Sequence, residues 1–300
     1  MTHLDPRAAF VVAALSLGCA RARGAPAQPP AMTRATYVSA EGSRELTVFR
    51  PSSVRGEKGA RALVVMLHGC TQTADDMARG TRMNAVAQRD GFLVLYPEQS
   101  AAANPQKCWN WFVPEQTMRD QGEAALLAGL IDSVVRAEGV SGSRVSLVGM
   151  SAGAAMAANL AVAYPERFAA LAMHSGIPAR AAKDLMSGLT VMRQGATDGA
   201  ALGAAALTAM GTRARGIPVI ALHGSDDKIV SPANLAAIAT QWMAVNAAAK
   251  GVPASVEVSM LPGVGHAWSG GSPNGTFTAP SGPDATKMIV EFLTKVGAIR

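Results

Sequence analysis

Cysteines, charged residues and regular repeats are all scarce in this sequence. Three cysteines among 300 residues are too few for a disulfide scaffold, and the 30 glycines show no collagen-like period of three. Charged residues make up only 16% of the chain, and the net charge of +6 is spread along it, without a nucleic-acid-binding run of lysine and arginine. No phosphate-binding loop, dinucleotide fingerprint or metal-ligand spacing occurs either. We therefore expect no nucleic-acid partner, no metal and no cofactor.

Hydrophobic residues are plentiful at 49%, which is ample for a buried core. Short apolar runs, typical of strands covered on both faces, alternate with segments of helical periodicity. This alternation predicts a single α/β domain with a doubly wound, mostly parallel sheet. Strands are expected at residues 36–39, 44–49, 62–67, 92–96, 144–148, 168–173, 218–222 and 255–260, and helices at residues 75–89, 122–137, 152–163, 232–248 and 283–295. Pro97 is expected to stop its strand, and the Ala/Gly-rich insertion at residues 178–215 has too weak a periodicity to predict its structure.

The N-terminal segment has the features of a secretory signal peptide. Residues 8–20 are an apolar stretch that follows Arg7, and residues 20–22 (Ala-Arg-Ala) offer a cleavage site between small residues. The stretch is shorter than the roughly 20 residues that span a bilayer, and no other segment is long and apolar enough to be a transmembrane helix. A buried N-terminal helix is the alternative, which the Pro/Ala-rich residues 25–31 disfavour.

Export sets the expected domain boundaries. We predict a signal peptide at residues 1–22, a linker at residues 23–34 and one domain at residues 35–300, secreted to the periplasm or the medium. Lipidation at Cys19 is an alternative, but Ser16 stands where such sites need an aliphatic residue.

Loss of Cys19 leaves two cysteines, Cys70 and Cys108. An oxidising compartment favours a disulfide between them, and such a bridge stabilises a fold by roughly 3–4 kcal/mol through loop closure. Two unrelated buried thiols are the alternative.

The strongest chemical signal is Gly-Met-Ser-Ala-Gly at residues 149–153. It directly follows one predicted strand and directly precedes a predicted helix, which is the setting of a nucleophile elbow. Gly149 and Gly153 give room for a sharp turn from which Ser151 projects over a helix N-terminus, where developing negative charge is stabilised. An ordinary glycine-rich turn is the alternative.

A serine hydroxyl needs a base, and elimination leaves one of the five histidines. His3 is lost with the signal peptide, and His68 precedes the serine, contrary to the order nucleophile, acid, histidine. His174 and His223 each end a predicted strand with no suitable acid before them. His266 follows both serine and acid, in a glycine-rich loop that lets the ring reach across the sheet edge. An isolated surface histidine is the alternative.

The acid is expected just past the strand at residues 218–222, where a carboxylate can orient the imidazole and stabilise its cation. Asp226 and Asp227 compete for this role. We favour Asp227, because the apolar residues 229–230 anchor the loop behind it while Asp226 caps the turn or faces solvent. Asp198, in the insertion, is a third candidate.

An oxyanion hole needs two backbone N–H groups. Ala152, directly after the serine, is expected to supply one, and Cys70, in the loop after the strand at residues 62–67, the other. A bridge from Cys70 to Cys108 would then stiffen a catalytic loop.

Three of the four tryptophans, Trp109, Trp111 and Trp268, lie in predicted loops. Exposed tryptophans need an apolar contact, so we expect these three to wall a cleft for an acyl chain or polymer segment. The alternative is that they pack the loop at Cys108 onto the body of the protein.

Several of these segments contain distinctive blocks. They are residues 67–73 (Leu-His-Gly-Cys-Thr-Gln-Thr), 96–99 (Tyr-Pro-Glu-Gln), 108–112 (Cys-Trp-Asn-Trp-Phe) and 265–271 (Gly-His-Ala-Trp-Ser-Gly-Gly), together with the serine elbow. The blocks resemble the secreted polyhydroxybutyrate depolymerase family, an esterase branch of the α/β-hydrolases close to the feruloyl and acetyl-xylan esterases. The resemblance covers about residues 35–297.

The resemblance implies an α/β-hydrolase fold with Ser151, Asp227 and His266 as the catalytic triad, because the family's acid is the fifth residue of a His-Gly-x-x-Asp motif. It also implies that the Cys70 amide belongs to the oxyanion hole and that Cys70 and Cys108 form a disulfide.

We therefore expect an exported serine esterase that hydrolyses short-chain hydroxyalkanoate esters or oligomers through an acyl-enzyme. Many polymer-degrading members carry a separate polymer-binding domain, whereas this chain stops at Arg300, so soluble oligomers are expected rather than solid polyester, and a monomer. The alternatives are a feruloyl or acetyl-xylan esterase, a peptidase, or a catalytically inactive hydrolase fold that serves as a binding module.

Overall fold

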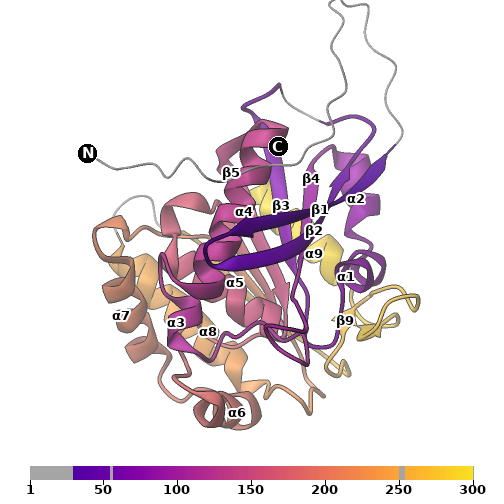
Figure 1. Cartoon of the computed structure of the whole chain (residues 1–300). Coiled ribbons are helices and arrows are strands. Elements are labelled where there is room, and N and C mark those ends of the chain that lie inside the picture. The colour runs from indigo at the N-terminus through magenta and orange to yellow at the C-terminus, as the bar shows by residue number, and fades with distance from the viewer. Residues whose placement is uncertain (1–29, 55–56, 250–253, 300) are drawn as a thin grey trace, which may run out of the picture.

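The computed structural model describes residues 30–54, 57–249 and 254–299. Its centre is an eight-stranded sheet with the strand order β1-β2-β4-β3-β5-β6-β7-β8 (Figure 1). The hairpin β1–β2 and the pair β2–β4 are antiparallel, and all other neighbours in the sheet are parallel. The strands are β1 (Ala31–Ser39), β2 (Gly42–Arg50), β3 (Arg61–Leu67), β4 (Leu93–Glu98), β5 (Val140–Met150), β6 (Ala170–His174), β7 (Val219–Gly224) and β8 (Val256–Leu261).

Helices cover both faces of the sheet, and strand β3 shows why. Leu63, Val65 and Leu67 belong to the hydrophobic cluster that includes α4, α5 and α8, while Val64 and Met66 belong to the cluster that includes α1, α2 and α9. All five side chains are fully buried, as expected of a parallel strand between two helical layers. The helices are α1 (Ala74–Thr81), α2 (Met83–Asp90), α3 (Pro114–Thr117), α4 (Gly122–Glu138), α5 (Ala152–Ala163), α6 (Leu185–Gln194), α7 (Gly199–Met210), α8 (Ala233–Ala248) and α9 (Ala285–Lys295).

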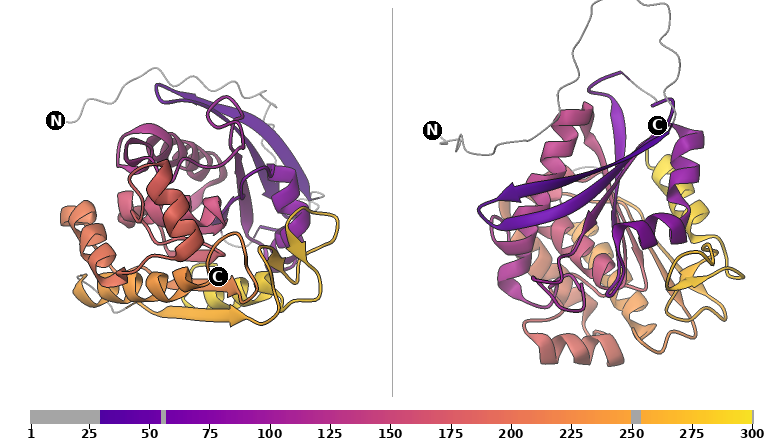
Figure 2. Two further views of the ribbon diagram at one scale, coloured as in Figure 1. Left: turned by 90° about the horizontal axis from the view of Figure 1, so that it is seen from below. Right: turned by 45° about the vertical axis from the view of Figure 1, so that its right-hand side comes forward.

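Shorter elements complete the fold. Single 3₁₀ turns occur at Pro165–Arg167 and Gly211–Arg213, and a two-stranded parallel sheet joins β9 (Trp268–Ser269) to β10 (Thr278–Ala279). In the view from below, α6 lies in front of the sheet and the segment with β9 and β10 lies to one side (Figure 2). None of the described helices is long and apolar enough to cross a membrane.

Two elements differ from the sequence-based expectation. The helix expected at residues 75–89 is two helices, because Arg82 has φ 57° and ends α1 before α2 begins. The strand expected to stop at Pro97 continues to Glu98. Pro97 lies opposite Leu46 of β2, and the pairing of β4 with β3 on the other side reaches only Leu95, so the missing N–H of proline breaks no ladder there.

The chain ends and the insertion add two further findings. Strand β1 begins at Ala31, so residues 31–34 of the predicted linker are strand, while the predicted signal peptide lies outside the described residues. The insertion at residues 178–215 contains α6 and α7. Side chains at their N-termini supply the start signals, since Asp184 accepts a hydrogen bond from Ser187 N at 2.7 Å and Asp198 accepts one from Ala201 N at 2.8 Å.

Candidate active site

Ser151 lies at the junction of β5 and α5, at the carboxyl end of a parallel strand. Its backbone has φ 56° and ψ −123°, a conformation that residues other than glycine adopt rarely and at an energetic cost. The Ser151 N–H donates to His174 O at 2.9 Å, which ties the turn to the neighbouring strand β6. This sharp turn from strand to helix has the geometry of a nucleophile elbow, and it lies at the carboxyl edge of the sheet.

The two glycines of the motif are required by space. A Cβ atom on Gly149 would lie 2.3 Å from Gly153 O, and one on Gly153 would lie 2.1 Å from Leu67 O. Both distances are shorter than real Cβ contacts, so any side chain here would push α5 away from β5 or β3. The elbow therefore brings strand and helix as close together as their backbones permit.

His266 approaches the serine from the loop that follows β8. Its Nε2 lies 2.9 Å from Ser151 Oγ, within hydrogen-bond distance of the hydroxyl. The loop is anchored to the loop after β7, where Asp226 N donates to Val264 O at 2.9 Å. A Cβ on Gly224 would lie 2.1 Å from the same Val264 O, so the two loops are in close contact. The histidine ring is thus held in place by backbone packing.

Asp227 follows β7, is 3% exposed and completes a chain of hydrogen bonds. Its Oδ2 accepts from His266 Nδ1 at 2.7 Å, and its Oδ1 accepts from Ile229 N at 2.9 Å and Val230 N at 2.8 Å. His223 Nε2 lies 3.3 Å from Asp227 Oδ2 and 3.0 Å from Val230 O. Burial disfavours the charged carboxylate, but hydrogen bonds from His223 and His266 outweigh burial and hold the pKa of Asp227 well below its ordinary value.

The other two candidate acids lie elsewhere. Asp226 is exposed, and its carboxylate accepts from Ser225 Oγ at 2.9 Å. Asp198 caps the N-terminus of α7. Of the three carboxylates considered, the structure brings Asp227 to His266.

Two buried histidines lie beside these hydrogen bonds, and their contacts were not predicted from the sequence. His223 is fully buried against Asp227, and its Nδ1 has no hydrogen-bond partner among the described residues. His174 is also fully buried and stacks on Trp268 with 5.1 Å between ring centroids. Burial lowers the pKa of His174 to about 3, so this ring is neutral at neutral pH. The sequence feature that could have predicted these contacts is position, because His174 lies at the carboxyl end of β6 and His223 lies near the carboxyl end of β7.

Two backbone N–H groups are available beside the serine. Ala152 is the first residue of α5, where the N–H groups lack acceptors within the helix. The loop after β3 lies against the serine, since a Cβ on Gly69 would be 3.4 Å from Ser151 Cβ. Among the described residues, Cys70 N donates to no other group. Both amides therefore remain free for an oxygen atom of a ligand.

The loop that carries Cys70 is fixed from several sides. The predicted disulfide between Cys70 and Cys108 is present. His68 Nδ1 donates to Gly69 O at 2.7 Å, and His68 Nε2 accepts from Gln99 N at 3.0 Å. Burial lowers the pKa of His68, which favours the neutral ring that can play both roles. The position of the Cys70 amide is thus set before any ligand binds.

A small pocket of about 160 Å³ opens beside Ser151, and we call it the serine pocket. Its lining is mostly apolar and comes from the end of β5 with the turn after it, from four other loops and from α6. The residues that line it are residues 69–72, Met150, Ser151, Met192, Ile229, His266 and Phe277.

The three loop tryptophans do not line this pocket. Trp109, Trp111 and Trp268 are 0%, 7% and 1% exposed. Trp109 Nε1 donates to His68 O at 3.0 Å, and Trp268 Nε1 donates to Thr286 Oγ1 at 3.0 Å. The expectation that these three tryptophans wall a substrate cleft is therefore corrected. As in the alternative interpretation, they pack loops onto the body of the protein.

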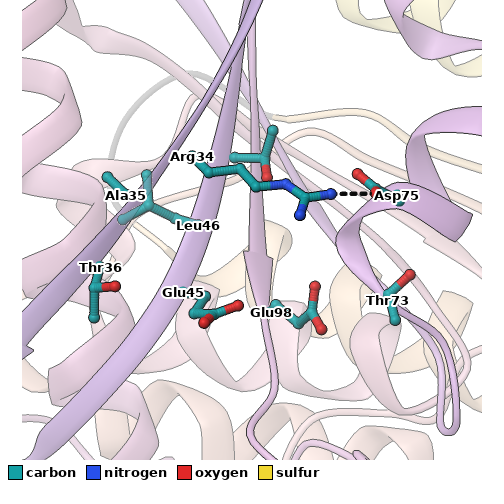
Figure 3. A pocket seen from close by; sticks show the side chains of 9 residues that line it. Arg34, Ala35, Thr36, Glu45, Leu46, Thr73, Asp75 and Glu98 are labelled. Atoms are coloured by element: carbon teal, nitrogen blue, oxygen red, sulfur yellow. Dashed lines mark hydrogen bonds and ion pairs between the residues drawn. The ribbon is translucent and has the colours of Figure 1, made fainter.

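A larger hollow of about 410 Å³ lies at the β1–β2 hairpin, and we call it the hairpin hollow. It is lined by residues 34–36, 45–47, Thr73, Asp75 and Glu98. Figure 3 shows Arg34 and Asp75 joined across it by an ion pair, with the carboxylates of Glu45 and Glu98 beneath them. The residues that line it include no histidine and no serine. In the described part of the chain, no group of three or more His, Cys, Asp or Glu residues could hold a metal ion.

Comparison with known proteins places the chain in a family. The model of the esterase PHB depolymerase family matches residues 48–257. The chain belongs to this family. With its eight-stranded, mostly parallel sheet and covering helices, it has the α/β-hydrolase fold of esterases in a single domain.

The relatives that are similar in sequence are named for different substrates. Poly(3-hydroxyalkanoate) depolymerase C of Paucimonas lemoignei is 38% identical over 181 residues, which are 57% of this chain and 42% of that protein. Feruloyl esterase B of Neurospora crassa is 32% identical over 117 residues, 39% of each protein. The chain thus spans about two fifths of the length of these relatives.

Solved structures agree on the fold. An acetyl xylan esterase from Aspergillus awamori superposes with a TM-score of 0.66 at 21% identity, over 79% of this chain and 94% of that one. A poly(3-hydroxybutyrate) depolymerase from Bordetella parapertussis superposes with a TM-score of 0.56 at 20% identity, over 90% and 92% of the two chains.

Proposed function

We propose that this family member is a serine carboxylic ester hydrolase with Ser151, His266 and Asp227 as its catalytic triad. The observation that carries the proposal is the continuous hydrogen-bond chain from Ser151 Oγ through His266 to Asp227, with distances of 2.9 and 2.7 Å. Nucleophile and base within hydrogen-bond reach, with the base oriented by a third group, are the requirements for nucleophilic catalysis.

Each group then has one task. His266 Nε2 takes the proton of Ser151 as its Oγ attacks the ester carbonyl carbon, and the carbonyl oxygen becomes an oxyanion. The N–H groups of Cys70 and Ala152 donate to that oxyanion, and Asp227 stabilises the imidazolium. The intermediate collapses, His266 returns the proton to the leaving alcohol, and water then releases the acid by the reverse sequence.

The substrate class that we propose is short-chain hydroxyalkanoate esters and oligomers. The support is the relative named as a poly(3-hydroxyalkanoate) depolymerase, which aligns over more of this chain than the feruloyl esterase does, together with the apolar lining of the serine pocket. Feruloyl or acetylxylan esters are the second candidate, favoured by the similarity of fold to an acetyl xylan esterase. A screen of hydroxybutyrate oligomers, feruloyl esters and acetylated xylan separates these classes.

Export belongs to the same proposal. The apolar residues 8–20 and the cleavage pattern at residues 20–22 support a signal peptide, and the Cys70–Cys108 disulfide suits an oxidising compartment. The N-terminal sequence of the protein recovered from the periplasm or medium tests this point.

Hydrolysis of p-nitrophenyl butyrate, with covalent labelling of the serine by a fluorophosphonate, tests the activity. We expect turnover and labelling in the wild type, and the loss of both in Ser151→Ala with an unchanged circular dichroism spectrum. Turnover retained by Ser151→Ala would refute the assignment. A wild type that is neither labelled nor active would support the alternative of an inactive fold that only binds.

A further inference from the structure

The apolar wall of the serine pocket comes from distant parts of the chain. Met150 precedes the serine, Ile229 belongs to the loop after β7, Phe277 precedes β10, and Met192 lies on α6. Met192 is the contribution of the insertion at residues 178–215 to the pocket. The insertion therefore contributes one residue to the lining of the pocket.

The backbone around Met192 is held by hydrogen bonds to the loop behind Asp227 and to the side chain of Asn234 on α8. Ser231 N donates to Met192 O at 2.7 Å, and Asn234 Nδ2 donates to Val191 O at 3.0 Å. Asn234 Oδ1 also accepts from Ala196 N at 3.1 Å, just beyond the end of α6. These bonds involve no atom of the methionine side chain, so the backbone stays in register when that side chain is changed.

The proposed reaction indicates which part of the substrate occupies the serine pocket. The acyl group stays attached to Ser151 Oγ after the alcohol has left, and its carbonyl oxygen lies toward the amides of Cys70 and Ala152. The alcohol leaves beside His266, which donates the proton. Phe277 borders that side, with 6.4 Å between its ring centroid and that of His266. The part of the serine pocket that lies beside Ser151 and is lined by Met192 is therefore available to the acyl chain.

The serine pocket is partly open, and its volume indicates how large an acyl group it can enclose. A dry cavity of roughly 150 Å³ holds a molecule of the size of benzene, with about six non-hydrogen atoms. The serine pocket, with about 160 Å³, is of this size. A four-carbon hydroxyacyl group has about six non-hydrogen atoms, whereas a feruloyl group has about twice that number and exceeds the pocket.

We propose that Met192 is the residue that sets the upper length of the acyl group, and that it restricts the site to short aliphatic acyl chains of about four carbons. This inference rests on the proposed function, because it needs an acyl-enzyme at Ser151. The flexible thioether suits a wall that adjusts to groups of slightly different shape.

The test varies the acyl chain while the leaving group stays the same. We expect Met192→Ala to raise the ratio of kcat/KM for p-nitrophenyl octanoate to that for p-nitrophenyl butyrate by roughly tenfold or more, since each methylene in an apolar pocket changes kcat/KM by about 10- to 200-fold. Met192→Phe narrows the pocket, and we expect the optimum to move toward the acetate.

Met186→Ala is the matched control. Met186 lies on the same helix, is 71% exposed and does not line the pocket, so its replacement removes the same side chain without changing the wall. We expect the wild-type ratio in this variant. Should Met192→Ala fail to fold, as judged by its thermal unfolding midpoint, Met192→Val provides a smaller change with the same expected direction.

The outcomes separate this inference from the proposed function. A wild-type ratio in a Met192→Ala protein that is folded and labelled by fluorophosphonate would overturn the role of Met192 and leave the esterase intact. Equal shifts in Met192→Ala and Met186→Ala would also overturn it. Absence of labelling and hydrolysis in the wild type would instead contradict the proposed function itself.

Discussion

The serine pocket and the hairpin hollow differ in size and in chemistry, and the larger of them is not the candidate active site. The serine pocket has a volume of about 160 Å³ and contains Ser151 and His266, whereas the hairpin hollow has about 410 Å³ and contains carboxylates and threonines. The first lies where loops from the carboxyl ends of parallel strands converge, and the second lies beside an antiparallel hairpin. Ligand sites of α/β sheets occur at the carboxyl ends of strands. Topology therefore locates the chemistry better than volume does.

The charges in the two regions are also used differently. Asp227 is 3% exposed, and two backbone N–H groups together with the ring of His266 donate to its carboxylate. In the hairpin hollow, Asp75 pairs with Arg34, whose side chain is 72% exposed. Exposed ion pairs contribute little free energy, whereas a buried, fully bonded carboxylate has a fixed position and a fixed charge. The serine pocket is thus organised in advance for one reaction.

The largest expected effect tests which carboxylate orients His266 in the serine pocket. We expect Asp227→Asn to lower kcat for p-nitrophenyl butyrate by roughly 10³- to 10⁴-fold, because an amide neither stabilises the imidazolium nor fixes its tautomer. Asp226→Asn is the matched control, and a change of no more than a few-fold is expected, because that carboxylate is exposed and, among the described residues, accepts a side-chain hydrogen bond only from Ser225 Oγ. The opposite ranking of the two variants would assign the acid to Asp226.

A second, smaller effect concerns the pH dependence of stability that the buried His174, beside His266 and Asp227, contributes. The ring of His174 is buried beside His223, His266 and Asp227, and its pKa is lowered to about 3 in the folded protein, whereas an unfolded histidine has a pKa of about 6.5. The unfolded chain therefore binds a proton between these values that the folded chain does not. We expect the free energy of unfolding to fall as the pH drops below about 6.5, by up to about 1.4 kcal/mol per pH unit for this residue.

Urea unfolding at pH 7 and pH 5 measures this dependence. His174→Gln removes the titrating ring, and we expect a smaller loss of stability between the two pH values than in the wild type. The buried His68 contributes in the same direction, so the variant retains part of the slope. Measurement above pH 5 also keeps Asp227 ionised in both states, so its lowered pKa does not contribute. If His174→Gln and the wild type lost the same stability between pH 7 and pH 5, the lowered pKa of His174 would not explain the pH dependence.

Local spacing made much of the serine pocket predictable from the sequence. Residues 149–153 carry the elbow within five positions, and the contacts of Gly149 and Gly153 show that backbone crowding dictates those glycines. His266 was predicted by elimination, because the sequence has only five histidines. The choice of Asp227 over Asp226 rested on which side chain turns inward, and the structure places Asp227 beside the ring.

What the sequence did not predict depends on contacts between distant segments. Pro97 continues its strand because β3 no longer pairs with β4 at that point, which no local pattern reveals. The tryptophans were expected in a cleft, but all three are buried, and the N–H groups of Trp109 and Trp268 donate to His68 O and Thr286 Oγ1. The contribution of α6 to the serine pocket could not be predicted, because its side chains are only partly packed. In addition, backbone atoms make the hydrogen bond that joins Met192 to the loop behind Asp227.

The smallest expected effect tests whether the hairpin hollow takes part in catalysis at all. Glu45 projects into it from β2 and is exposed (Figure 3), so Glu45→Gln removes one charge from the hollow while it preserves the shape of the side chain. Surface substitutions of this kind change the free energy of unfolding by no more than about 0.5 kcal/mol. We expect kcat/KM for p-nitrophenyl butyrate to stay within about twofold of the wild type, because His266 and Ser151 lie in the other pocket. A tenfold loss would show that the hollow binds part of the substrate, and the contrast between the two regions would then no longer hold.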